Sequence, residues 1–392
     1  MKTPSDNPAL IDPLGLTSAG FVQACRERGY SPTVALEAYR RTFREGAATA
    51  PAAPALAPIA LTLREDSSEG EVVKFLMRVP GSGDIPTGVQ GKPLEIESVL
   101  IPMIGSSGTS TYTLCVSSQV GCAMGCTFCE TAQMGLIRSL TAAEIVGQWY
   151  AARHIIGIAP KNIVFMGMGE PMDNYDNVMQ AIAVLKDHNG AGVPISNITV
   201  STVGRVDGIR KMAEQIKQDG WHRLNLALSL NAPNDAVRSE IMPVNRKWRM
   251  AELQEALLSW PKFAGNKLCI EYVLIPGVND RPEHVQEIAD FMRPFGTVLA
   301  RQGQETGAQR PESQATQKPR ALINLIPYNP RRNSPWPAPS EEQVDTFLNA
   351  LIAAGVFAKR RRTKGRTMMG ACGQLGAAHI RQRRLVEPTV SA

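Results

Sequence analysis

The chain has 392 residues, of which 43% are hydrophobic and 20% are charged. This composition can fill a large core and excludes a wholly disordered chain. No run of about eighteen apolar residues occurs, so we expect no membrane span, and the first ten residues lack the apolar stretch of a secretory signal. We therefore expect a cytoplasmic protein. The formal net charge of +6 permits a polyanionic partner without requiring one.

The N-terminal part of the chain divides into three segments. Spaced apolar residues predict a small helical accessory domain over residues 1–45. Residues 46–70 begin as an Ala/Pro-rich stretch and are predicted to be a linker. Residues 71–110 contain two strand-like runs and are predicted to be a β extension that leads into the core.

A core of alternating strands and helices is predicted over residues 111–358, interrupted by a polar, Gln-rich insertion at 301–320 that we expect to be flexible. Capping boxes are expected at Thr141 with Glu144 and at Ser340 with Gln343. Such alternation favours parallel strands joined by right-handed crossovers, as in a partial barrel or an open sheet, and periodicity alone does not choose between them. The six strand-like runs lie at 111–118, 162–166, 198–202, 224–230, 269–275 and 321–326.

Seven cysteines are present, an odd number that argues against a disulfide framework. Three of them, Cys122, Cys126 and Cys129, form a C-x3-C-x2-C cluster. Thiolates suit iron–sulfur clusters or zinc, but structural zinc normally takes four closed ligands and no fourth lies nearby. Three thiolates on a four-iron cluster leave one iron open to activate a substrate. A zinc site or a buried cysteine cluster is the alternative.

The cysteine spacing, with Phe128 before the last cysteine, resembles the radical S-adenosylmethionine (SAM) superfamily. The resemblance implies an α/β fold with a partial (β/α)6 barrel. It also implies a 4Fe-4S cluster whose open iron chelates SAM, and reductive cleavage of SAM to a 5′-deoxyadenosyl radical. Gly169 and Glu170, which follow the second strand in GMGEP, resemble the SAM-binding motif of that superfamily. Further SAM contacts are expected at the ends of later strands, where the alternative is turn or cap chemistry, at Ser201, Ser229, Leu230, Asn231 and Asn329.

More of the chain resembles one family, the RlmN/Cfr family of RNA adenine methyltransferases. The matching stretches are LCVSSQVGC (114–122), GMGEPMDN (167–174), NLIPYNP (324–330) and ACGQL (371–375), and the resemblance spans roughly residues 94–376. The cysteine of ACGQL, Cys372, is decisive because most radical SAM enzymes lack it. One departure is Asn231, where the family usually has histidine.

The resemblance implies a covalent route, because an adenine carbon such as C2 or C8 is not a nucleophile. Cys372 takes a methyl group from one SAM, and the radical made from a second SAM removes a hydrogen from that methyl group. The methylene radical adds to the adenine, a base removes the ring proton, and Cys115 resolves the thioether by forming a disulfide with Cys372. Glu97 matches the position of the proton acceptor, and Glu95 on the same face of its strand is the alternative.

The final segment, residues 359–392, is basic and carries Cys372. Six basic residues crowd 359–366, where they are predicted to grip RNA phosphates beside the reacting base or, alternatively, to form a solvated tail. The expected partners are RNA and an external electron donor such as a flavodoxin-type reductant, and we expect a monomer.

The first expectation for the substrate is C2 of an adenine in 23S ribosomal RNA, with transfer RNA as a further substrate. Methylation at C8 or of another RNA is the alternative within the family. Two hypotheses from other classes are a radical SAM enzyme that acts on a small molecule and an RNA-binding protein with a structural metal. An enzyme that acts on a small molecule would leave the roles of Cys115 and Cys372 unexplained.

Overall fold

The computed structural model describes residues 10–81, 94–105, 108–296 and 319–376. Most of the predicted insertion at 301–320 and the basic residues Arg381, Arg383 and Arg384 lie outside these ranges. None of the helices among the described residues combines the length and apolar character that a membrane crossing requires.

A ten-stranded sheet forms the centre of the described chain, in the order β1-β2-β3-β4-β7-β8-β9-β10-β11-β12. Neighbouring strands are antiparallel from β1 to β4 and parallel from β4 to β12. A separate hairpin pairs β5 (Gln119–Gly121) with β6 (Leu136–Ser139). The strands of the large sheet are β1 (Ile59–Ser67), β2 (Gly70–Val79), β3 (Leu94–Ile104), β4 (Ser110–Cys115), β7 (Asn162–Phe165), β8 (Ile198–Thr202), β9 (Asn225–Ser229), β10 (Leu268–Leu274), β11 (Ala321–Pro327) and β12 (Ala358–Arg360).

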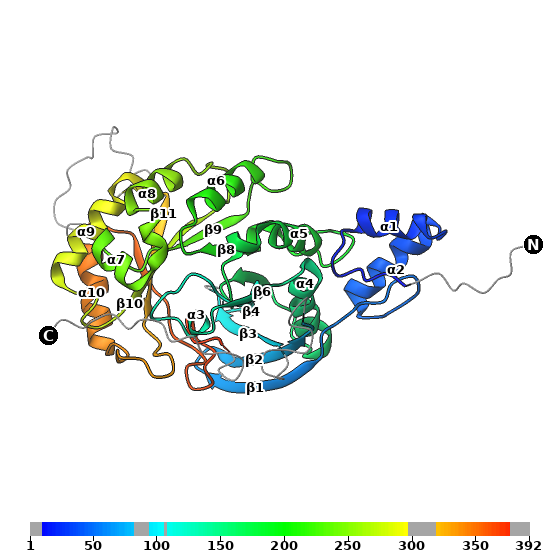
Figure 1. The fold of residues 1–392 in the computed structure, drawn as a ribbon, viewed down its shortest axis with the longest axis horizontal. Helices are drawn as coiled ribbons and strands as arrows, with labels where there is room; N and C mark the ends of the chain where they lie inside the picture. The colour runs from blue at the N-terminus through cyan, green and yellow to red at the C-terminus, as the bar shows by residue number, and fades with distance from the viewer. Residues whose placement is uncertain (1–9, 82–93, 106–107, 297–318, 377–392) are drawn as a thin grey trace, which may run out of the picture.

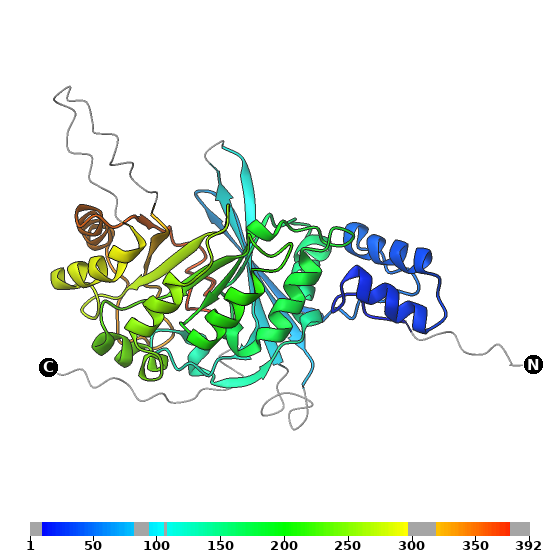
Figure 2. The same cartoon turned by 90° about the horizontal axis from the view of Figure 1, so that it is seen from above.

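The parallel part of the sheet is a partial (β/α)6 barrel. The sheet curves, and α4 to α10 cover its outer side while α3 lies within the curve (Figure 1, Figure 2). All six strand-like runs predicted from the sequence coincide with parallel strands, so the partial barrel is confirmed over the open sheet. The helices are α1 (Ser18–Glu27), α2 (Pro32–Glu45), α3 (Glu130–Gln133), α4 (Ala142–Tyr150), α5 (Tyr175–Leu185), α6 (Val206–Gln215), α7 (Asp235–Ile241), α8 (Met250–Leu258), α9 (Pro282–Met292) and α10 (Glu341–Ala353).

Local sequence explains where two of the barrel helices begin. Thr141 and Ser340 each accept a hydrogen bond from the backbone N–H three residues on, and the side chains of Glu144 and Gln343 accept a bond back from the cap residue. Both predicted capping boxes are therefore confirmed. Each box satisfies two of the backbone donors that a helix start leaves without partners.

The predicted helical unit at the N-terminus is present as α1 and α2, and it packs against the barrel. The N–H of Ser18 donates to Asp187 Oδ2 over 2.6 Å, and the rings of Phe43 and Trp149 lie 6.2 Å apart. The buried apolar residues of α1 and α2 belong to the same hydrophobic cluster as those of the barrel strands.

The predicted linker at 46–70 is wrong in its second half, because β1 (Ile59–Ser67) lies there and pairs antiparallel with β2. The reason is visible in the sequence IALTLRE, which alternates apolar and polar residues as an edge strand does. The Ala/Pro-rich composition just before it obscured this strand. The β extension of 71–110 is confirmed as β2 and β3, to which β1 adds a third strand.

Candidate active site

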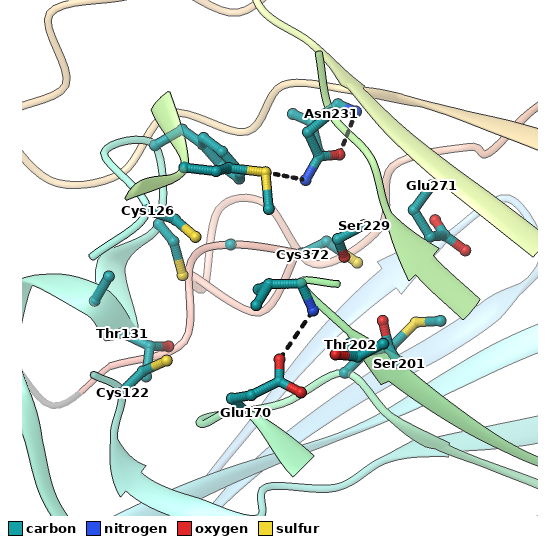
Figure 3. A pocket seen from close by; sticks show the side chains of 18 of the residues that line it. Cys122, Cys126, Thr131, Glu170, Ser201, Thr202, Ser229, Asn231, Glu271 and Cys372 are labelled. Carbon is teal, nitrogen blue, oxygen red and sulfur yellow. Dashed lines mark hydrogen bonds between the residues drawn. The ribbon is translucent and has the colours of Figure 1, made fainter. Parts of the chain in front are cut away.

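The three clustered cysteines lie on a loop at the carboxyl end of the barrel, between β5 and α3. Their side chains line one cavity together with Cys372, which comes from the far end of the chain (Figure 3). Active sites of barrels and α/β sheets lie at this end of the strands. The distant thiol of Cys372 therefore shares one cavity with the three clustered cysteines.

All three clustered thiols have a raised pKa. The main cause is burial, and neighbouring thiols raise the pKa of Cys122 and Cys126 further. A metal cation removes this cost because it takes the place of the thiol protons. Within the described ranges, no group of three His, Cys, Asp or Glu side chains is arranged to hold a single metal ion. Three buried thiols that line one cavity are a donor set that fits three irons of a 4Fe-4S cluster, whereas structural zinc normally takes four ligands.

The glycine-rich turn after β7 packs directly on the strand end that leads into the cysteine loop. A Cβ atom on Gly167 would lie 2.6 Å from the backbone oxygen of Val116. At Gly169, where φ is +101°, it would lie 2.5 Å from Cβ of Gln119. Only glycine allows this approach, which places Gly169 and Glu170 on the cavity wall.

Glu170 is almost completely buried at the start of this wall. Its carboxylate accepts hydrogen bonds from the backbone N–H groups of Met172, over 3.0 Å, and Val203, over 2.9 Å. Burial raises the pKa of Glu170, and these N–H groups oppose the rise. A buried carboxylate at a cavity wall is suited to bind a cationic group such as an ammonium.

The predicted residues at the ends of β8 and β9 fall into two groups. Ser201, Ser229 and Asn231 line the cavity (Figure 3). Asn231 has a positive φ of 56° and its amide oxygen accepts the N–H of Val273 over 2.9 Å. Leu230 is fully buried and does not line the cavity, so only its backbone helps to shape the site.

Cys372 lies between two cavities. Besides the cavity of the cluster cysteines, it lines a smaller one with Arg361, Arg362 and Lys364. The predicted residue Asn329 lines this second cavity rather than the first. Its amide group donates to the backbone oxygen of Cys372 over 3.4 Å, so it positions the thiol loop.

Cys115 ends β4 and is buried near Cys372. Burial is the main cause that raises the pKa of Cys115 to about 12, the proximity of Cys372 adds to it, and Arg361 opposes it. The Arg361 guanidinium has its own pKa raised, mainly by Cys372 and also by Glu271. The two thiols of the predicted relay therefore share one cationic neighbour.

Glu97 lies on β3 outside the lining of both cavities. Its Oε2 is 2.8 Å from Nζ of Lys74, and both side chains are buried. It also accepts the N–H of Gly376 over 3.1 Å, four residues after Cys372. Glu95 instead pairs with Arg78, whose side chain is exposed. The structure thus connects Glu97 to the segment that carries Cys372.

The basic stretch at 359–366, which the sequence predicted to grip RNA phosphates or to form a solvated tail, is partly paired with acidic residues of this chain. Arg360 is paired with Glu341 and Asp345, and Lys364 is paired with Glu69 over 2.8 Å. Arg361 is turned toward the thiols. The acidic partners come from the β1–β2 turn and α10, which a reading of the local sequence could not supply.

The sequence analysis missed two buried charged residues of this site. Glu271 lies within the otherwise apolar strand β10, lines the cavity and accepts hydrogen bonds from the amide of Asn324. A charged residue within an apolar strand sequence is the signal that could have identified Glu271. Arg238 is fully buried and donates to the backbone oxygens of Leu230 and Ser229, over 3.0 and 3.2 Å, so it braces the end of β9. Nothing in the local sequence of α7 marks Arg238.

Comparison with known proteins places this geometry in a family. The model of the radical SAM superfamily matches residues 116–292. A probable dual-specificity RNA methyltransferase RlmN from Protochlamydia amoebophila is 37% identical over 83% of this chain and 78% of its own length. The dual-specificity RNA methyltransferase RlmN of Xanthomonas campestris is 39% identical over 76% of this chain and 70% of its own length.

A solved structure has the same fold over almost the whole chain. It is a radical SAM methyltransferase from Sphaerobacter thermophilus, with a TM-score of 0.74 and 32% identity, and the match covers 94% of this chain and 99% of the other. Together with the cysteine loop, the glycine turn and the distant thiol, these matches show that the chain belongs to the RlmN family of the radical SAM superfamily.

Proposed function

We propose that this radical SAM enzyme methylates C2 of an adenine in ribosomal and transfer RNA by relaying the methyl group through Cys372. The observation that carries the proposal is the position of Cys372 at the boundary of two cavities, with the cluster cysteines on one side and a cationic wall on the other. The relatives named above are described as dual-specificity RNA methyltransferases, which agrees with two kinds of RNA substrate.

The first cavity provides the residues that would hold the cofactors. Cys122, Cys126 and Cys129 would bind three irons of a 4Fe-4S cluster and leave the fourth open. Gly169, Glu170, Ser201, Ser229 and Asn231 line the rest of the cavity and would contact SAM. When bound, the cluster and SAM supply a carbon radical able to remove a hydrogen from a methyl group.

Cys372 would act as the methyl acceptor. A thiolate is the nucleophilic form of cysteine, and the guanidinium of Arg361 is a cationic neighbour of this thiol. Its sulfur would displace the neutral thioether from the sulfonium of SAM and keep the methyl group. Cys115 would later attack the sulfur of Cys372, so that the carbon leaves with the RNA and a disulfide remains.

Glu97 would accept the ring proton. Its carboxylate forms a buried ion pair with the Lys74 ammonium over 2.8 Å. Its contact with Gly376 places it next to the segment that carries the thiol. Glu97 itself lines neither cavity.

The second cavity would receive the target adenine. A base must leave its stack before its carbon can meet the sulfur of Cys372. Arg361, Arg362 and Lys364 on the cavity wall provide positive charge for the adjoining phosphates. We further propose that the protein works as a monomer in the cytoplasm and receives electrons from an external reductant of the flavodoxin type.

Mass spectrometry of RNA tests the proposal. The cluster-loaded enzyme is incubated with SAM, a reductant, and ribosomal or transfer RNA, and the nucleosides are then analysed. We expect 2-methyladenosine in both RNAs, no product with Cys372→Ala, and normal product with Cys25→Ala, whose buried thiol lies in α1. Appearance of 8-methyladenosine would correct the position of methylation. Product formation by Cys372→Ala would exclude the methyl relay.

A further inference from the structure

A short basic segment between α7 and α8 packs on the outer side of the cysteine loop. Ala123 and Met124, which lie between the first two cluster cysteines, line a surface depression with Val244, Lys247 and Trp248. The same loop is tied to the end of α7, because the N–H of Thr127 donates to the backbone oxygen of Ile241 over 3.0 Å. Ala123 is exposed and Met124 is half-buried, so the cysteine loop reaches the surface here.

The basic segment contains free positive charge. Residues 243–249, PVNRKWR, include three cations and no acid, and Arg246, Lys247 and Arg249 are all exposed. None of the three forms an ion pair with another residue in the described part of the chain. Nearby Arg205 differs, since it is paired with Asp173 and Asp207. The segment therefore exposes three cations that form no ion pair among the described residues, and Lys247 also acts electrostatically on Asp207.

An aromatic ring lies among these cations. Trp248 is half-buried, with Nζ of Lys247 at 4.3 Å and Cζ of Arg205 at 5.2 Å from its ring centroid. Aromatic and arginine side chains in a partly apolar depression are typical of protein contact surfaces. The depression is lined by Ala123 and Met124, which precede Cys126 in the cysteine loop, and Cys122 and Cys126 of the same loop line the cavity of the cluster cysteines.

We propose that Met124, Arg246, Lys247, Trp248 and Arg249 form a docking surface for an acidic electron-transfer protein, which reduces the cluster through the cysteine loop. We call these five residues the docking surface. The proposal rests on the proposed function, because it needs a cluster held by the loop. One electron leaves the reduced flavin of the partner, which becomes a semiquinone, and enters the cluster. The partner is thus oxidised by one electron and the cluster is reduced by one.

Electron transfer explains this position better than RNA binding does. Its rate falls steeply with distance, so a donor must approach the cluster closely, and here the cysteine loop itself is exposed. The RNA must reach Cys372 through the second cavity, whose wall is attached to β2 and β3 by Lys74 and Glu97. Figure 1 shows α7 and α8, which flank the basic segment, across the molecule from these strands.

The expected complex is weak and sensitive to salt. Electron-transfer partners bury a small interface, less than about 1,200 Å² in total, and exposed charges mainly speed their encounter. The attraction between exposed charges is largely screened beyond about 10 Å at 0.1 M salt, and this distance shortens as salt is added. This predicts that raising the salt concentration weakens binding of the partner without altering the cluster.

The test uses the full-length, cluster-loaded protein with a bacterial flavodoxin, an acidic flavoprotein, as the probe. The triple variant Arg246→Glu, Lys247→Glu, Arg249→Glu is compared with a control variant, Arg223→Glu, Lys262→Glu, Lys267→Glu. The control residues are exposed too, lie beyond the amino-terminal ends of β9 and β10, and give the same change in formal charge. Circular dichroism checks that both variants fold, and iron content checks that both bind the cluster.

Three quantities are measured: the dissociation constant for flavodoxin, the rate at which the cluster is bleached by flavodoxin hydroquinone or by dithionite, and the affinity for RNA. We expect the docking variant to bind flavodoxin at least about tenfold more weakly and to be reduced correspondingly more slowly by it. Reduction by dithionite and RNA affinity remain at the wild-type level, and the control variant resembles the wild type.

Three results would overturn the proposal. Equal weakening in the control variant would show a general effect of net charge. Loss of RNA affinity with unchanged flavodoxin binding would make this segment an RNA-binding surface. Unchanged binding and reduction in both variants would show that the donor docks elsewhere. If flavodoxin reduces the cluster as expected but no methylated adenine forms, the docking surface stands and the proposed function fails.

Discussion

Nζ of Lys74 lies 2.8 Å from Oε2 of Glu97, and both side chains are almost completely buried. The two residues are diagonal neighbours on one face of the β2–β3 pair, because Lys74 is opposite Val99 and Leu76 is opposite Glu97. Lys74 also donates to the backbone oxygen of Met369 over 2.9 Å. This ion pair therefore fastens the thiol segment to the β extension.

Lys74→Met should destabilise the protein strongly. It leaves the carboxylate of Glu97 buried without its cation, and breaking such a pair costs about 3–5 kcal/mol. Urea unfolding measures the loss. The double variant Lys74→Met, Glu97→Gln removes the buried charge as well, and we expect it to recover a large part of the loss. A single variant as stable as the wild type would show that the pair does not hold the segment.

Glu97→Gln should separate the two halves of the reaction. We expect Cys372 to be methylated normally, because the carboxylate is not needed for that step, while release of 2-methyladenosine falls at least about a hundredfold, the usual scale for loss of a general base. Peptide and nucleoside mass spectrometry report the two steps. Glu95→Gln is the matched control, since Glu95 lies two residues away and pairs with Arg78. If only Glu95→Gln reduced the release of 2-methyladenosine, Glu95 rather than Glu97 would be the proton acceptor.

The two relay thiols should differ in their reactivity with pH. Burial raises the pKa of Cys115 to about 12, so its thiolate remains scarce through neutral and mildly alkaline pH. We expect iodoacetamide to label the half-buried Cys372 first, and Cys115 only as the pH approaches about 12, as read by peptide mass spectrometry of the loaded protein. Because the folded protein holds this proton more tightly, the free energy of unfolding should fall as the pH rises from the ordinary cysteine value toward that pH.

Arg361→Met should slow the methylation of Cys372. The guanidinium is the cationic neighbour shared by Cys372, Cys115 and Glu271, so its removal takes away the positive charge beside the nucleophilic sulfur. We expect a loss of at least about tenfold in single-turnover methyl transfer to the protein. Arg362→Met is the control, because this neighbouring arginine is exposed. Equal losses in both variants would show that the effect comes from RNA contacts or from net charge, and not from the position of Arg361 beside the thiols.

The sequence predicted the parts of the molecule that are encoded locally. The parallel strands are short apolar runs because both their faces are buried, and each run can be recognised without knowing its neighbours in the sheet. The clustered cysteines lie within eight residues, so their motif is also visible in the local sequence. The pairing of Lys74 with Glu97 and the inward turn of Arg361 could not be predicted. Both depend on which strands are neighbours and in which register, and that is settled only by the packed sheet.

Gly167→Ala should abolish binding of SAM while leaving the outer fold intact. The new methyl group would lie 2.6 Å from the backbone oxygen of Val116, and neither strand end can yield without moving the cysteine loop or Glu170. We expect the cluster to load poorly, with no change of its spectrum when SAM is added. Gly20→Ala in α1 is the control, because its Cβ would meet only ordinary contacts of 3.5 Å or more and alanine favours helices by about 1 kcal/mol. Normal SAM binding by Gly167→Ala would show that the turn after β7 can move away from β4 without loss of the site.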